Sequence, residues 1–139
     1  MKTATLILMI ALLSPTKQQS VNKLTNTKWS LVKVIKEEVT QVADTTCRTT
    51  LNFNDSGHYT GYSGWNTFHG HYKINSNGGK LTMDNPIRTK RAGQPNCKLG
   101  ETLFDNFPKV SNFVLHGDTL IIRTVNNVKI IYSKSTPHQ

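Results

Sequence analysis

The chain is poor in the residues that most enzyme chemistry requires. Its 139 residues include only eight Asp and Glu and two cysteines, and charged residues make up 18% of the total. So few carboxylates offer no obvious pair for general acid–base catalysis. Gly-x-Ser-x-Gly, Walker and dinucleotide-binding motifs are also missing from the sequence. We therefore predict that the protein is not an enzyme and needs no cofactor.

Apolar runs long enough to span a bilayer as a helix are also missing. The one uninterrupted run, residues 6–13, follows Lys2 and precedes a polar stretch, which is typical of a secretory signal peptide. We predict a leader over residues 1–20, although no small-x-small motif marks its cleavage site. An uncleaved apolar tail is the alternative. Export would place the protein in the periplasm, in the cell envelope or outside the cell, with no transmembrane segment left after cleavage.

Acidic residues are scarce relative to basic ones. Lys2 and Lys17 are the only charged residues of the predicted leader, so residues 21–139 keep 15 basic and 8 acidic residues, a net charge of +7. The basic residues are scattered except for Arg88, Lys90 and Arg91, a cluster that we interpret as a solvated loop. We expect a monomer whose partner is an envelope protein or a cell-wall component, and we expect no nucleic acid.

Cys47 and Cys97 are the two cysteines. Two lone cysteines commonly pair in an oxidising compartment. A bond that closes a loop of about 50 residues would stabilise the fold by roughly 4 kcal/mol in the chain-entropy model. Two separate buried thiols are the alternative.

Short strands joined by turn residues dominate the pattern of the chain. One segment, residues 98–107, has apolar residues at helical spacing and ends at Pro108. Residues 36–46 show little periodicity and are predicted to be a polar connection. Strands are predicted over residues 29–35, 47–53, 58–62, 67–74, 80–83, 113–115, 120–125 and 128–132. We predict a mainly β fold over residues 21–139, a single domain formed by a compact antiparallel β-barrel-like meander with one short α-helix.

Three histidines raise the question of a metal site. His69 and His71 lie two apart in a predicted strand, so both leave the same face, and His58 lies in the preceding strand. Three imidazoles would suit zinc or copper. Histidine pairs are also common on exposed strand faces, and no carboxylate is placed in sequence to complete the ligand shell. These residues are weak metal candidates.

The middle of the chain has a recognisable motif. The spacing Gly61-x-x-Gly64-Trp65-Asn66-x-x-x-Gly70 resembles the glycine- and asparagine-rich core of the META (HslJ-like) domain family. Other matching features follow in family order over residues 24–134. They are Thr27, Trp29, Leu31, Leu51, Phe53, Thr89, Glu101, Gly117, Asp118 and Leu120. The resemblance implies a compact antiparallel β-barrel-like structure with one helix packed against it.

The family motif has two interpretations. Gly61, Gly64 and Gly70 would let the backbone bend or approach a neighbouring strand, and Asn66 would fix a turn. Alternatively, Tyr62, Trp65 and Asn66 form one wall of a binding site.

Two departures from the family motif limit which family functions can be transferred to this chain. Trp65 replaces the family's core cysteine, and Gly93 stands where a second cysteine is expected. Any function of the family's own cysteine pair is therefore not transferable to this chain.

Together these features predict a non-enzymatic protein of the cell envelope. The resemblance implies a stress-related structural or binding module, because members of the family are associated with envelope and stress phenotypes rather than with a reaction. The alternative is a β-barrel protein that binds a metal through His58, His69 and His71, or a small ligand in the barrel interior.

Overall fold

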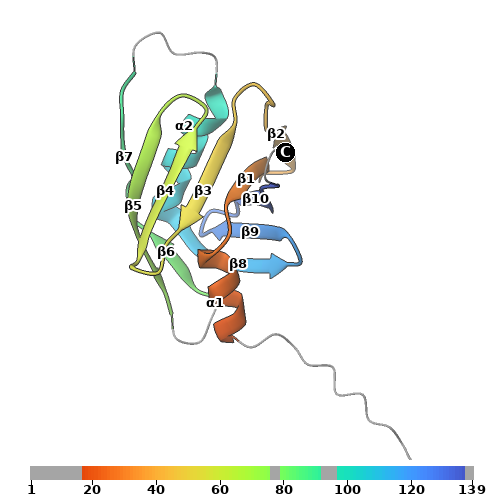
Figure 1. The fold of residues 1–139 in the computed structure, drawn as a ribbon. Helices are drawn as coiled ribbons and strands as arrows, with labels where there is room; N and C mark the ends of the chain where they lie inside the picture. The colour runs from red at the N-terminus through yellow and green to blue at the C-terminus, as the bar shows by residue number, and fades with distance from the viewer. Residues whose placement is uncertain (1–16, 76–78, 92–96, 137–139) are drawn as a thin grey trace, which may run out of the picture.

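A computed structural model describes residues 17–75, 79–91 and 97–136. The described residues form one ten-stranded antiparallel sheet with the order β6-β5-β4-β3-β1-β10-β9-β8, while β2 pairs with β1 and β7 pairs with β5 (Figure 1). The strands are β1 (Trp29–Lys36), β2 (Val39–Val42), β3 (Thr49–Phe53), β4 (His58–Ser63), β5 (Thr67–Ile74), β6 (Leu81–Met83), β7 (Ile87–Arg88), β8 (Val110–His116), β9 (Thr119–Thr124) and β10 (Lys129–Lys134).

The two ends of the sheet approach each other, so that the sheet is nearly closed. Lys80, next to β6, forms an antiparallel bridge with Asn112 of β8, and the Phe113 N–H donates to the Gly79 carbonyl at 2.9 Å. The predicted fold class, a mainly β antiparallel barrel, is confirmed. Closure leaves fewer unpaired strand edges than an open sheet would have.

Side-chain alternation decides which face of the sheet is buried. In β5 the residues alternate between exposed and buried, with Phe68, Gly70 and Tyr72 inside and His69 and His71 outside. The same alternation buries one face of β3. Fully buried side chains from several strands fill the interior, and they include Trp29, Leu51, Phe53, Tyr59, Leu81, Leu120, Ile122, Ile130 and Tyr132.

The predicted helix corresponds to α2 (Lys98–Asn106), which packs against β4 and β5 (Figure 1). Its buried face brings Phe104 within 5.3 Å of Phe68, measured between ring centroids. Pro108 lies in a short 3₁₀ turn, η1 (Phe107–Lys109), because proline cannot continue the α-helical hydrogen-bond ladder.

Strands β2 and β7 and a second α-helix, α1 (Lys17–Thr25), were not predicted from the sequence. Helix α1 is attached to the barrel by Leu24, which is fully buried and whose carbonyl accepts a hydrogen bond from Trp29 Nε1 at 3.1 Å. Its first turn overlaps the end of the leader predicted over residues 1–20, and residues 1–16 lie outside the described part. None of the described helices has the length and apolar character needed to cross a membrane.

Candidate functional site

One end of the barrel is held together by a disulfide. Cys47, which follows β2, is bonded to Cys97, which immediately precedes α2, and their Cα atoms lie 5.6 Å apart. The structure therefore supports the predicted pairing. Gly64 packs against this bond with a φ of +89°, and a Cβ at this position would lie 3.2 Å from Cys97 Sγ. A side chain at position 64 would therefore be strained and would also crowd the disulfide.

Asn66 holds the segment after β7 against the turn between β4 and β5. Its buried side-chain oxygen accepts hydrogen bonds from Thr89 Oγ1 at 3.2 Å and from the Arg91 N–H at 3.1 Å. Its backbone also bonds to Ser63, whose N–H donates to the Asn66 carbonyl at 2.8 Å. This geometry favours the structural interpretation of Asn66, because its side-chain oxygen already accepts two internal hydrogen bonds.

Trp65 and Tyr62 are half-buried beside Asn66. The Trp65 indole N–H donates to the Arg91 carbonyl at 3.3 Å, and the Arg91 guanidinium carbon lies 5.9 Å from the indole ring centroid. The exposed parts of Trp65 and Tyr62 leave their predicted binding role open.

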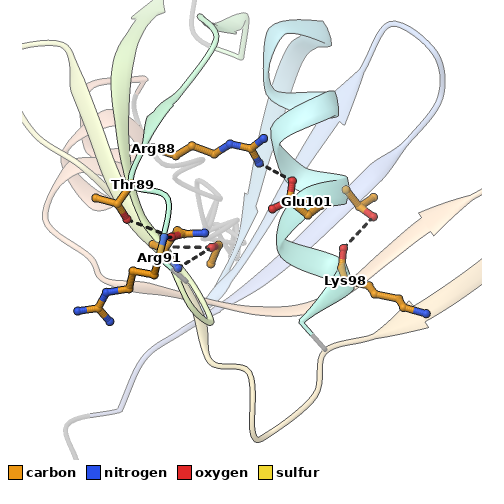
Figure 2. A network of polar contacts seen from close by, with 8 residues as sticks. Arg88, Thr89, Arg91, Lys98 and Glu101 are labelled. Atoms are coloured by element: carbon orange, nitrogen blue, oxygen red, sulfur yellow. Dashed lines mark hydrogen bonds and ion pairs between the residues drawn. The ribbon is translucent and has the colours of Figure 1, made fainter. Parts of the chain in front are cut away.

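The basic segment 88–91 is exposed along its whole length, and two of its basic side chains also make contacts within the fold. Arg88 forms an ion pair with Glu101 in the first turn of α2, and its guanidinium carbon lies 4.7 Å from the Phe104 ring centroid. Figure 2 shows Arg88 extending toward Glu101, with Thr89 and Arg91 farther along the same segment. Two of the three basic side chains, Arg88 and Arg91, therefore have contacts that position this segment.

Gly61 and Gly70 lie where other groups of the fold approach the backbone closely. A Cβ on Gly61 would collide with the Thr50 carbonyl and the Phe68 ring. A Cβ on Gly70 would lie 2.5 Å from Asp84 Oδ1 and from the Tyr59 hydroxyl. Both glycines allow close approach, as the structural interpretation of the motif predicts.

The structure brings together two of the three candidate histidines. His58 and His71 are register partners on β4 and β5, whereas His69 is paired with Thr60. Within the described ranges, no group of three or more His, Cys, Asp or Glu side chains is placed to hold a metal ion. The three-histidine arrangement is therefore not formed.

A groove runs between β2 and α2, beside the disulfide. It consists of two adjoining pockets of about 270 and about 600 Å³, which share Gln41 and Thr102 in their linings. We call it the β2–α2 groove. Val42, Leu99 and both cysteines line the first pocket, which lies nearest the disulfide. Val39, Lys36 and Asp105 are among the residues that line the second pocket.

Strand β2 has a free outer edge along this groove. In the described part of the structure it pairs with β1 only, and all four of its residues are exposed. The Ala43 N–H donates to the Val32 carbonyl, so residues 39, 41 and 43 direct their backbone groups toward β1. Thr40 and Val42 therefore direct their backbone N–H and C=O groups away from β1, toward the free edge. Val39 and Val42 are 62% and 74% exposed.

The family model of the META domain matches residues 22–137. The chain belongs to the META domain family. No curated protein matches the chain. Among solved structures, an NMR structure of a protein from Burkholderia xenovorans is similar, with a TM-score of 0.66 and 16% identity. The alignment covers 90% of this chain and 94% of that one.

Two further structures have the same fold. A crystal structure of a DUF4847 family protein from Bacteroides vulgatus has a TM-score of 0.60 and 9% identity, covering 86% of this META domain and 99% of that chain. Another NMR structure has a TM-score of 0.59 and 18% identity, with coverage of 87% and 96%. At these identities the likeness establishes the fold alone.

This META domain departs from the family motif in the position of its cysteines. Trp65, in place of the family's core cysteine, contacts the segment after β7, while the bond between Cys47 and Cys97 joins the two walls of the groove. Gly93 lies outside the described residues.

Sequence reasoning missed the groove because it missed β2. Glu37 and Glu38 form the hairpin turn with φ values of +49° and +64°, a conformation that usually requires Asn or Gly. Because no Asn or Gly marks a turn at this point, residues 36–46 were predicted to be a polar connection without a strand. The available signal was the pair of β-branched residues, Val39 and Thr40, followed by Val42.

Proposed function

We propose that this META domain is an exported, non-enzymatic protein of the cell envelope that binds an extended polypeptide segment of a partner in the β2–α2 groove. The observation that carries the proposal is the outer edge of β2. Its outward backbone groups are open to another strand, and two large valines beside them are exposed. Addition of a strand to a free edge supplies backbone hydrogen bonds for affinity and side-chain pockets for specificity.

Two features support export. The apolar run at residues 6–13 follows Lys2, as in a secretory leader. The bond between Cys47 and Cys97 suits an oxidising compartment, because thiols are kept reduced in the cytosol. An interior filled by aromatic and aliphatic side chains favours the groove over the barrel interior as the place for a ligand.

The binding proposal is tested with a library of random heptapeptides displayed on phage and selected against the purified protein. Selected peptides should bind the wild type, and Val39→Lys with Val42→Lys should weaken this binding at least tenfold. Val125→Lys is the matched control, because Val125 is an exposed valine (73%) that does not line the groove. Bound peptide should also slow amide exchange at Thr40 and Val42. Absence of enriched peptides, or equal loss in the control, would overturn the proposal, and a small ligand would then be sought in the pocket beside the disulfide.

Export is tested by the intact mass of the protein recovered from the native host's envelope fraction without reductant. We expect the loss of an N-terminal segment of about 14–20 residues, consistent with the usual extent of a leader. A further loss of two hydrogens would report the disulfide. A full-length, reduced protein in the cytosol would contradict this part of the proposal.

A further inference from the structure

His58 and His71 form a close pair on the outer face of the sheet. They are direct partners across β4 and β5, with ring centroids 4.5 Å apart and ring planes inclined at 48°. The neighbouring pair is hydrogen-bonded, since the Tyr72 N–H donates to the Gly57 carbonyl at 2.9 Å. Alternation along an antiparallel ladder therefore makes His58 and His71 a non-hydrogen-bonded pair, the type whose side chains lie closer together.

Each imidazole is oriented through its Nδ1 atom. His71 Nδ1 lies 3.1 Å from Asp84 Oδ2, and His58 Nδ1 lies 3.1 Å from Ser56 Oγ. The Nε2 atom of each ring is left as the coordinating nitrogen. A metal-binding histidine typically donates its other ring N–H to a carboxylate, which fixes the tautomer and makes the coordinating nitrogen more basic. In the Asp84–His71 contact, a carboxylate lies within hydrogen-bond distance of Nδ1 in the same way.

Asp84 is itself held in place by the edge of the sheet. Its Oδ1 accepts a hydrogen bond from the His71 N–H at 2.8 Å, and its own N–H donates to the His71 carbonyl at 3.0 Å. The space for this carboxylate exists because Gly70 has no side chain, since a Cβ would lie 2.5 Å from Asp84 Oδ1. One glycine of the family motif thus makes room for the carboxylate that orients His71.

We propose that His58 and His71 bind one late first-row divalent cation through their Nε2 atoms, with water completing the coordination shell and Asp84 as a positioning residue. Metal–nitrogen distances of about 2.0–2.1 Å place the centroids of two imidazoles on one ion about 5 Å apart. Small rotations from the observed 4.5 Å reach this spacing. Imidazole ligands suit Cu²⁺, Ni²⁺ and Zn²⁺, with Cu²⁺ bound most tightly.

The metal site proposed at His58 and His71 is independent of peptide binding in the β2–α2 groove. His58 is the first residue of β4, whereas Tyr62 and the turn that follows it, near the disulfide, lie at the other end of that strand. His69 is exposed on the same face of β5 as His71 but lies opposite Thr60, so it is the matched control.

The test is calorimetric titration of purified, tag-free, chelator-treated protein with Cu²⁺ and with Zn²⁺. We expect one ion per chain at this pair, with tighter binding of Cu²⁺. His58→Ala and His71→Ala should each weaken binding at least tenfold, while His69→Ala should leave it unchanged. Asp84→Asn should weaken it by about 10–100-fold, as is usual when the partner of a ligating histidine is changed. Cooperative thermal unfolding of each variant, well above the temperature of the titration, would show that it is folded.

A second measurement does not depend on variants. In wild-type protein, substoichiometric Cu²⁺ should broaden the imidazole resonances of His58 and His71 before those of His69, and Zn²⁺ should shift their Nε2 rather than their Nδ1 resonances. Lack of saturable binding, an equal loss of affinity in His69→Ala, or broadening that begins elsewhere would each overturn the proposal. The two rings would then be a stacked surface pair.

Discussion

Two buried tyrosines place their hydroxyl groups in contrasting surroundings. The Tyr132 hydroxyl has no hydrogen-bond partner among the described residues, and its burial raises the pKa of this side chain. The Tyr59 hydroxyl donates to the Asp84 carbonyl at 2.7 Å. A buried polar group without a partner loses its hydration with no compensating bond.

Removing the two hydroxyls should therefore have different effects on stability. Tyr132→Phe should leave the free energy of unfolding unchanged or raise it by up to about 1 kcal/mol, whereas Tyr59→Phe should lower it by about 1 kcal/mol. Urea unfolding of both variants measures the difference. A loss of more than 1 kcal/mol in Tyr132→Phe would show that its hydroxyl has a partner that the structure does not contain.

Asp84 should contribute to the pH dependence of stability. Partial burial acts to raise the pKa of its carboxyl, but hydrogen bonds from the His71 backbone and imidazole outweigh this and lower the pKa below its ordinary value. A carboxyl whose pKa is lower in the folded state stabilises the fold above the ordinary pKa of about 3.9. This contribution is lost as the pH falls through the lower, folded-state pKa.

Asp84→Asn should accordingly be less stable than the wild type at pH 6, and the difference should shrink below pH 3. The effect should be small, because the side chain is about half exposed (49%) and water screens its interactions. Urea midpoints at the two pH values measure it. A difference that grows on acidification would contradict the direction of this pKa change.

At the scale of single elements, Gly100 lets helix α2 pack closely against the end of β4. In an exposed helix, alanine is favoured over glycine by about 1 kcal/mol. Here a Cβ would lie 2.5 Å from the Ser63 carbonyl oxygen and 2.8 Å from Ser63 Cβ. Because of this close contact with the Ser63 backbone, replacing Gly100 by alanine should lower the free energy of unfolding instead of raising it.

Gly100→Ala should therefore lower the free energy of unfolding by about 2 kcal/mol, the usual cost of overfilling a packed region. Thr102→Ala, two residues along the same helix and only half-exposed, should change it by less than about 0.5 kcal/mol. Thermal and urea unfolding of the pair give the comparison. A gain of stability in Gly100→Ala would mean that α2 can move away from Ser63.

Elements with regular periodicity were predictable from the sequence, and those defined by their contacts were not. The alternation in β5 and the apolar spacing before Pro108 gave strand and helix with bounds close to those observed. Strand β2 was missed because its turn is made by Glu37 and Glu38, and β7 is too short to show alternation. The bounds of α1 depend on the burial of Leu24 against the barrel, a tertiary effect with little local pattern.

The candidate sites also divide into features that the sequence predicts and features that depend on tertiary contacts. Cys47 and Cys97 could be paired from their number and the predicted compartment. The register that opposes His58 to His71 rather than to His69 depends on the turn between β4 and β5, and the role of Asp84 depends on β6 reaching the edge of β5. Contacts across several strands are set by register, which a single sequence does not encode locally.

At the scale of the whole molecule, the disulfide joins parts of the chain separated by 50 residues. Cys47→Ser with Cys97→Ser should lower the free energy of unfolding by up to about 4 kcal/mol, because the unfolded chain regains the freedom of a large loop. Wild-type protein in reductant should lose a similar amount. A loss below about 1 kcal/mol would indicate that the reduced unfolded chain keeps structure in this region.

Strand β1 lies in the interior of the sheet order, with β3 on one side and β10 on the other. Trp29 of β1 pairs with Lys134 of β10. One edge of β1 therefore stays unpaired until β10 has formed. On a ribosome, all residues up to β10 must emerge before this pairing can form, and contacts so distant in sequence form slowly. The nascent barrel therefore stays open until β10 has been released, and only then is its fold completed.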